Sequence, residues 1–189
     1  LSAVRNLQST YPDQQFLISL LTFDDEVKWL VKPAPIQELK ELPSNAFTPR
    51  GMTALLDAIG KGMHHIESEY GRKIQHDEMS VVMVIITDGA ESAAQFFNYK
   101  SIAKKIKERD ESGKWTFSFI GCDFDAANIS EQLNIRKENV RNYSKRNYGL
   151  MSKEVDSSFM RYAESKSNGS FGLKNFHFFD EEDDNNITY

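Results

Sequence analysis

Continuous apolar segments recur along the chain, and each is short enough to form a single β-strand. They span residues 16–23 and 81–86, and a further strand is predicted over 115–120. Strands that are apolar on both faces are typical of parallel sheets with helices on either side. A further segment, 27–31, alternates apolar and polar residues and predicts an edge strand, which Pro33 and Pro35 are expected to end.

Segments with helical periodicity lie between these strands. One helix is predicted to open at Thr53, because apolar residues recur on one face at positions 55, 56, 59, 63 and 66. The remaining expectations are helices before Pro12, up to Arg109, over 126–133 and over 149–165, and a short strand over 140–143. This alternation predicts a Rossmann-like, three-layer α/β/α domain whose central sheet is mostly parallel, with one antiparallel edge strand.

The totals limit the class of protein. With 189 residues, 40% of them hydrophobic, the chain is long enough for one core. Its 28 acidic and 23 basic residues give a net charge of -5, which argues against nucleic acid as a partner. No apolar run approaches the roughly 18 residues of a membrane span. The single cysteine, Cys122, has no partner for an intrachain disulfide and predicts a reducing, cytoplasmic setting.

Two segments place oxygen-bearing side chains where α/β sheets bind ligands, one at the start of a predicted helix and one at the end of a predicted strand. The first, 48–59, contains Gly51-Met52-Thr53, and the second, 84–92, contains Thr87-Asp88-Gly89 at the end of a strand. Ligands of parallel sheets bind beyond the carboxyl ends of the strands. We therefore expect both segments to contribute to one site.

In this order the two motifs resemble those of the von Willebrand factor type A family. There, a Gly-x-Thr loop and a Thr-Asp-Gly strand end form part of a metal-ion-dependent adhesion site. Segments 115–121 and 122–125 also resemble the fifth-strand region of bacterial members. The resemblance covers most of the chain and assigns residues 1–170 to a von Willebrand factor type A-like domain.

The resemblance implies a protein–protein interaction module and not an enzyme. It implies that Thr53 and Asp88 offer oxygens to Mg²⁺, or to Mn²⁺ or Ca²⁺, and that an acidic residue of a protein partner completes the shell. The alternative is that Thr53 only caps the following helix and Asp88 only shapes a turn. Two other functions stay open: a metal-free scaffold, and a divalent-metal hydrolase, for which we cannot assemble a nucleophile and a base.

Five further residues are candidates for contacts with a partner: Asp24, Asp25, Arg50, Glu91 and Phe96. Asp24 and Asp25 suit either acid–base chemistry or a turn between two strands, and the turn is the simpler role. Phe96 lies in an aromatic segment, 96–99, that suits either an interface anchor or the packing of the next helix.

The chain departs from the family at its start, because no Asp-x-Ser-x-Ser strand precedes Leu1. That strand is central in the family's sheet, so a slot must be filled. One hypothesis inserts the C-terminal segment 171–189, with a strand over 171–179 and metal-binding acids at Asp180, Glu182 and Asp184. The alternatives are an edge strand followed by a solvated acidic tail, or a strand upstream of this sequence.

Overall fold

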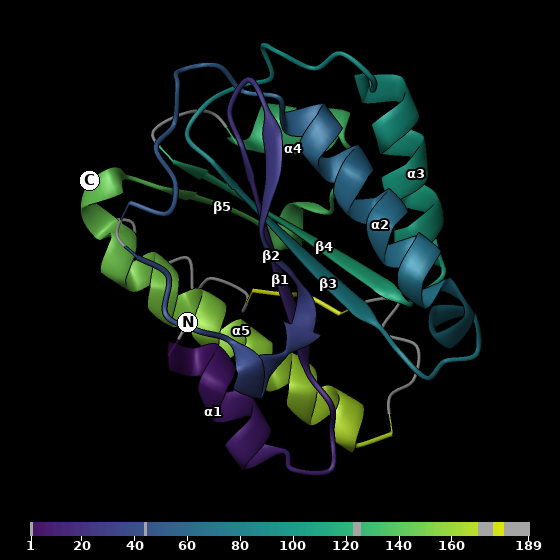
Figure 1. Ribbon diagram of the computed structural model, residues 1–189. Coiled ribbons are helices and arrows are strands. Elements are labelled where there is room, and N and C mark those ends of the chain that lie inside the picture. Colours follow the sequence, from purple (N-terminus) through teal and green to yellow (C-terminus); the bar gives the residue numbers. More distant parts are fainter. Residues whose placement is uncertain (1, 44, 123–125, 170–175, 180–189) are drawn as a thin grey trace, which may run out of the picture.

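The strands and helices alternate along the chain, as their apolar pattern predicts. The computed structural model describes residues 2–43, 45–122, 126–169 and 176–179, and Figure 1 shows the arrangement of its elements. The order is α1 (Ser2–Thr10), β1 (Leu17–Phe23), β2 (Val27–Pro35), α2 (Leu55–Gln75), β3 (Val81–Thr87), α3 (Tyr99–Glu111), β4 (Trp115–Cys122), α4 (Ala126–Gln132), β5 (Val140–Tyr143) and α5 (Tyr148–Ser167). Short 3₁₀ turns occupy Ile36–Glu38, Lys137–Asn139 and Lys145–Asn147.

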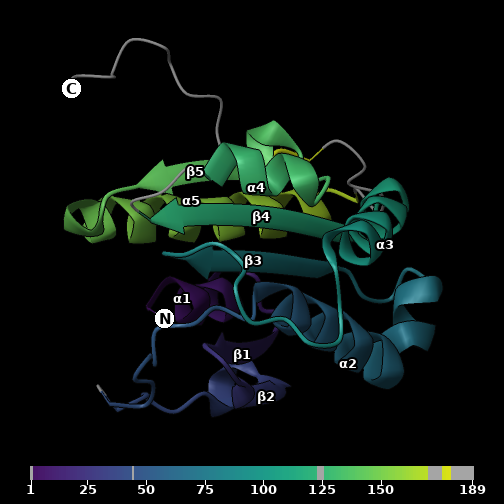
Figure 2. The same ribbon diagram turned by 90° about the horizontal axis from the view of Figure 1, so that it is seen from above.

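Three strands form a parallel sheet in the order β3-β4-β5. β3 and β4 pair along their whole length, from Val81 opposite Trp115 to Thr87 opposite Gly121. Helices α2, α3 and α4 lie on one side of the strands, and α1 and α5 lie on the other (Figures 1 and 2). The predicted mixed α/β class with helices in two outer layers is confirmed. Among the described residues, no helix is both long and apolar enough to cross a membrane.

β1 and β2 form a separate antiparallel hairpin, so the strands do not make one continuous sheet. The second strand continues through Pro33 and ends at Pro35, so the predicted end is confirmed for Pro35 and wrong for Pro33. Proline lacks a backbone N–H but is tolerated on an edge strand. Pro35 lies opposite Leu17, and the register of the hairpin shifts between Ile18 and Leu20.

β1 and β3 are more exposed than their apolar sequences predict. Leu20 of β1 is 37% exposed and Ile86 of β3 is 46% exposed, whereas every residue of β4 from Trp115 to Gly121 is buried. The difference follows from the neighbours of each strand. β4 has β3 on one side and β5 on the other, but β1 and β3 each pair with a single strand among the described residues.

A cavity of about 970 Å³ lies between the hairpin and the parallel sheet. Its walls include consecutive residues of both strands, 19–23 of β1 and 81–87 of β3. Side chains of α2, among them Ile59 and Ile66, and Met151 of α5 also line it. In Figure 2 the strands follow one another as β5, β4, β3, β1 and β2, and the cavity lies between the third and fourth of these. We call this cavity the strand slot.

The described part of the C-terminal segment packs away from the strand slot. Phe178 and Phe179 are buried with Ile120 of β4 and Met151 of α5. The amide of Phe178 donates a 2.7 Å hydrogen bond to Asn139 Oδ1. Residues 176–179 form no strand, so the hypothesis of a strand over 171–179 is wrong for these four positions. The rest of that segment, with Asp180, Glu182 and Asp184, lies outside the described residues.

Candidate functional site

Thr53 and Asp88 lie at the carboxyl end of the strand slot, where both line its wall. Thr53 is half-buried and Asp88 is exposed. The Thr53 hydroxyl oxygen lies only 3.0 Å from the point that a Cβ atom would occupy on Gly89, so a larger residue there would press on the hydroxyl. The structure therefore brings the two motifs predicted from the sequence to one place.

The capping role considered for Thr53 is not seen. The N-cap of α2 is Ala54, and no side chain caps it, so Thr53 is not the capping residue. In the turn after β3, the Thr87 hydroxyl donates a 2.9 Å bond to the Gly89 carbonyl and accepts one of 3.2 Å from the Gly89 amide. Thr87 thus supplies two hydrogen bonds of the turn in which Asp88 lies.

Glu91 satisfies the start of α2 from the loop that follows β3. One carboxylate oxygen accepts a 2.7 Å bond from the amide of Leu56. The other accepts bonds of 2.7 Å from Ala93 and 2.6 Å from Ala94. The first amides of a helix have no partner within the helix and attract negative charge, so this carboxylate stabilises both segments. Predicted as a partner contact, Glu91 already bonds to three amides of its own chain.

Asp57 makes the reciprocal contact from the first turn of α2. Its buried carboxylate accepts bonds of 2.9 Å from the amide of Gln95 and of 3.0 Å from those of Phe96 and Phe97. Sequence reasoning gave Asp57 no role. An acidic residue in the first turn of a helix was a visible signal, but the sequence could not show which amides it would bind.

Two neighbouring aromatic residues point in different directions from this loop. The Phe97 ring lies against Gly60 of α2, where an added Cβ would come within 2.5 Å of it, and it packs on the main core. Phe96, by contrast, is 70% exposed. The Lys61 ammonium lies 5.3 Å from the centre of its ring, within the range of a cation–π contact. Phe97 therefore packs inside, and Phe96 is presented on the surface.

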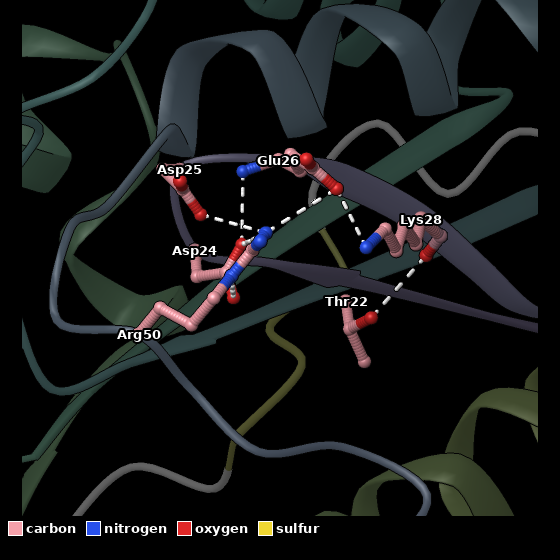
Figure 3. Close-up of polar contacts among 6 residues, drawn as sticks. All are labelled: Thr22, Asp24, Asp25, Glu26, Lys28 and Arg50. Atoms are coloured by element: carbon pink, nitrogen blue, oxygen red, sulfur yellow. Dashed lines mark hydrogen bonds and ion pairs between the residues drawn. The ribbon is translucent and has the colours of Figure 1, made fainter.

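The turn between β1 and β2 holds a cluster of ion pairs around Arg50 (Figure 3). Arg50 donates from Nε to Asp24 Oδ2 and from Nη2 to Asp24 Oδ1, both at 3.0 Å. It also pairs with Asp25 at 2.7 Å and with Glu26 at 3.2 Å. Lys28 lies 2.6 Å from Glu26. Three of the predicted partner-contact residues, Asp24, Asp25 and Arg50, are thus brought together.

Hydrogen bonds keep the Asp24 carboxylate ionised. Those from Arg50, and then that from the Glu26 amide, hold the pKa of Asp24 well below its usual range. Hydrogen bonds to the carboxylates of Asp24 and then Glu26 raise the pKa of Arg50. Bonds from Lys28 and Arg50 also lower the pKa of Glu26. A carboxylate this acidic is a poor general base near neutral pH, which favours the turn over acid–base chemistry for Asp24.

The described residues do not fit a complete metal site. Among them, no group of three or more His, Cys, Asp or Glu side chains is placed to hold an ion. Thr53 and Asp88 would offer two oxygens, whereas Mg²⁺ requires near-octahedral oxygen ligation. A dication would keep most of its water here, and we derive no chemistry from one.

Comparison of the sequence with known protein families and with curated proteins finds no match.

Proposed function

We propose that the chain is a protein–protein interaction module of the von Willebrand factor type A kind, which binds a partner at the carboxyl end of its strands. Support for the resemblance comes from Thr53 and Asp88, which line the same end of the strand slot. The slot itself lies beside β1, and the central strand that the resemblance implies is not among the described strands. A single cysteine, half-buried on β4, suits the cytoplasmic location that we propose with this function.

The exposed ring of Phe96 is the observation that carries the proposal. Its backbone is fixed, because Asp57 binds the amides on both sides of it and its own. An aromatic side chain on a fixed backbone loses little entropy on binding, and such residues supply much of the energy of interfaces.

The chemistry around Phe96 indicates what it would contact. Lys61 beside the ring is exposed and offers a positive charge. An apolar partner residue next to a carboxylate would fit both side chains. In this arrangement the acidic residue of the partner would pair with Lys61, so that it needs no metal.

Photo-crosslinking tests the proposal in cells that make the full chain. A benzophenone amino acid is placed at Phe96 and, as a matched control, at His76, an exposed residue at the opposite end of α2. We expect a defined crosslinked protein from position 96 and not from position 76. With that protein purified, Phe96→Ala should raise the dissociation constant of the complex by about 30-fold, the scale of an interface hot spot.

Equal crosslinking at the two positions, or an unchanged affinity of Phe96→Ala, would refute this surface. The melting temperature of Phe96→Ala should stay close to that of the wild type, because the side chain is mostly exposed. A metal-free scaffold without a partner at this end is the function that such a result would favour.

A further inference from the structure

The loop after β3 is held by a continuous series of hydrogen bonds, although its described residues 91–97 contain no helix or strand. All six consecutive amides from 92 to 97 donate a bond. The first two donate to the carbonyl of Thr53, at 2.9 and 3.2 Å. The last three donate to the carboxylate of Asp57. Residues at the start of α2 and just before it therefore determine the course of the loop.

Hydrogen bonds also run in the opposite direction, from the start of α2 to the loop. The Ser92 hydroxyl accepts a 3.0 Å bond from the amide of Thr53. The Glu91 carboxylate accepts a 2.7 Å bond from an amide in the first turn of α2. Each segment thus supplies acceptors for the amides of the other. We call the two segments, 53–57 and 91–97, the clasp.

The clasp joins the carboxyl end of the strand slot to the partner surface. Thr53, in its first segment, lines the slot. Phe96, in its second segment, is 70% exposed. The Phe96 ring lies beside Lys61, which is itself exposed, so the position of the ring is set by the backbone of the loop. Separation of the loop from Thr53 would therefore displace Phe96 as well.

The hydrogen bonds of the clasp are expected to break together. Asp57 is only 3% exposed, and three amides of the loop satisfy its carboxylate. Loss of any one of these bonds would leave a buried charge with less compensation, which is unfavourable. The Phe97 ring also packs against Gly60 of α2 and adds an apolar contact to the same unit. Segments that are tied in this way commonly open as one cooperative unit.

We propose that the clasp couples the Thr53 end of the strand slot to the partner surface at Phe96, because its two segments separate as one unit. The partner binds only the closed clasp, so the apparent dissociation constant rises as the closed fraction falls. Ser92 is a positioning residue, since its hydroxyl holds Thr53 and acts on Phe96 through the clasp. The effect on binding rests on the function proposed for Phe96, whereas the opening of the clasp is measurable without a partner.

Amide hydrogen exchange of the full chain, followed by NMR, tests whether the clasp opens as one unit. Ser92→Ala removes the acceptor of the Thr53 amide and leaves the acceptor of amides 95–97 in place. We expect exchange at 95–97 to become about fivefold faster, the scale of one lost hydrogen bond. Exchange at the buried strand β4 should stay at the wild-type rate and show that the fold is intact.

Ser101→Ala is the matched control for Ser92→Ala. It removes a hydroxyl that accepts the amide of Asn98, just beyond the clasp, and should leave exchange within the clasp unchanged. Wild-type exchange at 95–97 in Ser92→Ala would overturn the coupling, even if the amides next to Ser92 exchanged faster. Equal acceleration by the two variants would overturn it as well.

Asp57→Ala tests the coupling in the reverse direction and its effect on the partner. Exchange should become faster at 92 and 93, whose amides donate to Thr53 and not to Asp57. With the benzophenone crosslinker at position 96, we expect the yield of crosslinked protein to fall at least twofold. Asp25→Ala, which removes a half-exposed ion-pair partner of Arg50, should leave the yield unchanged.

The two arms separate failure of the coupling from failure of the proposed function. Faster exchange at 92 and 93 with an undiminished crosslink yield would overturn the dependence of binding on the clasp. Unchanged exchange at these amides would overturn the cooperative opening. A wild-type chain that gives no defined crosslink from position 96 would refute the function proposed for Phe96 and with it the effect on binding, while the exchange rates would still decide whether the clasp opens as one unit.

Discussion

β3 and β4 are neighbours in one sheet. β4 has the more polar sequence of the two, yet it is the more deeply buried strand. Six of the seven residues of β3 are apolar, but only Ile85 and Thr87 are buried. β4 includes Thr116, Ser118 and Gly121 and is buried throughout these positions. The two strands pair in register, so the contrast comes from their other edges, β5 for β4 and the strand slot for β3. Burial here depends on what lies beside a strand as well as on its side chains.

The same contrast separates the two halves of the molecule. On the side of β4, the strands are joined by parallel pairing and by a common core. The hairpin of β1 and β2 does not pair with the parallel sheet. Hydrogen bonds around the start of α2 connect the hairpin and the loop after β3 to that helix. Variants that act on one side only can test how far the two sides differ.

The largest difference is expected between two isoleucines that are register partners, Ile120 of β4 and Ile86 of β3. Ile120 is fully buried and Ile86 is 46% exposed. Ile120→Ala should lower the free energy of unfolding by about 2–5 kcal/mol, the range for a buried cavity. Ile86→Ala should lower it by about 1 kcal/mol or less, because much of its side chain already meets solvent. Urea unfolding measures both.

Equal losses for the two variants would contradict the comparison. They would mean that Ile86 is covered in solution, as it would be if a strand already occupied the slot.

The sequence predicted the elements better than it predicted their neighbours. Apolar runs at 16–23 and 81–86 predicted β1 and β3, and period and composition are local properties that a sequence displays directly. Burial on both faces was wrongly expected for β1, because burial depends on pairing between distant segments. For the site, Thr53 and Asp88 were found as motifs, but Asp57 was missed, since its partners are amides 38 to 40 residues away.

Asp57→Ala is expected to lower the free energy of unfolding, because it loosens the loop after β3. The change removes the acceptor of three amides, those of residues 95–97. Hydrogen bonds to a charged group contribute more than neutral ones, and we expect a loss of about 2–3 kcal/mol, since water can reach part of the loop. Urea unfolding gives this loss, and faster amide hydrogen exchange over 88–98 would place it in the loop.

Asp25→Ala is the matched control for Asp57→Ala. Asp25 is 43% exposed and forms an ion pair with Arg50. An exposed ion pair contributes little, so the loss should stay within about 0.5–1 kcal/mol. If Asp25→Ala cost as much as Asp57→Ala, the stability of this end would come from its general charge and not from the capped loop.

The smallest effect on stability is expected from Mg²⁺ at the carboxyl end of the strand slot, beside Thr53 and Asp88. Thr53 and Asp88 would supply two of the oxygens of a near-octahedral shell, and the rest would be water. With a dissociation constant of about 1 mM or weaker, 1 mM Mg²⁺ would stabilise the fold by at most about 0.4 kcal/mol. The melting temperature should therefore rise by no more than about 2 °C. A larger rise that Asp88→Ala abolishes and Asp25→Ala preserves would show that further oxygens complete the site. It would also make the carboxyl end of the strand slot a metal-binding edge.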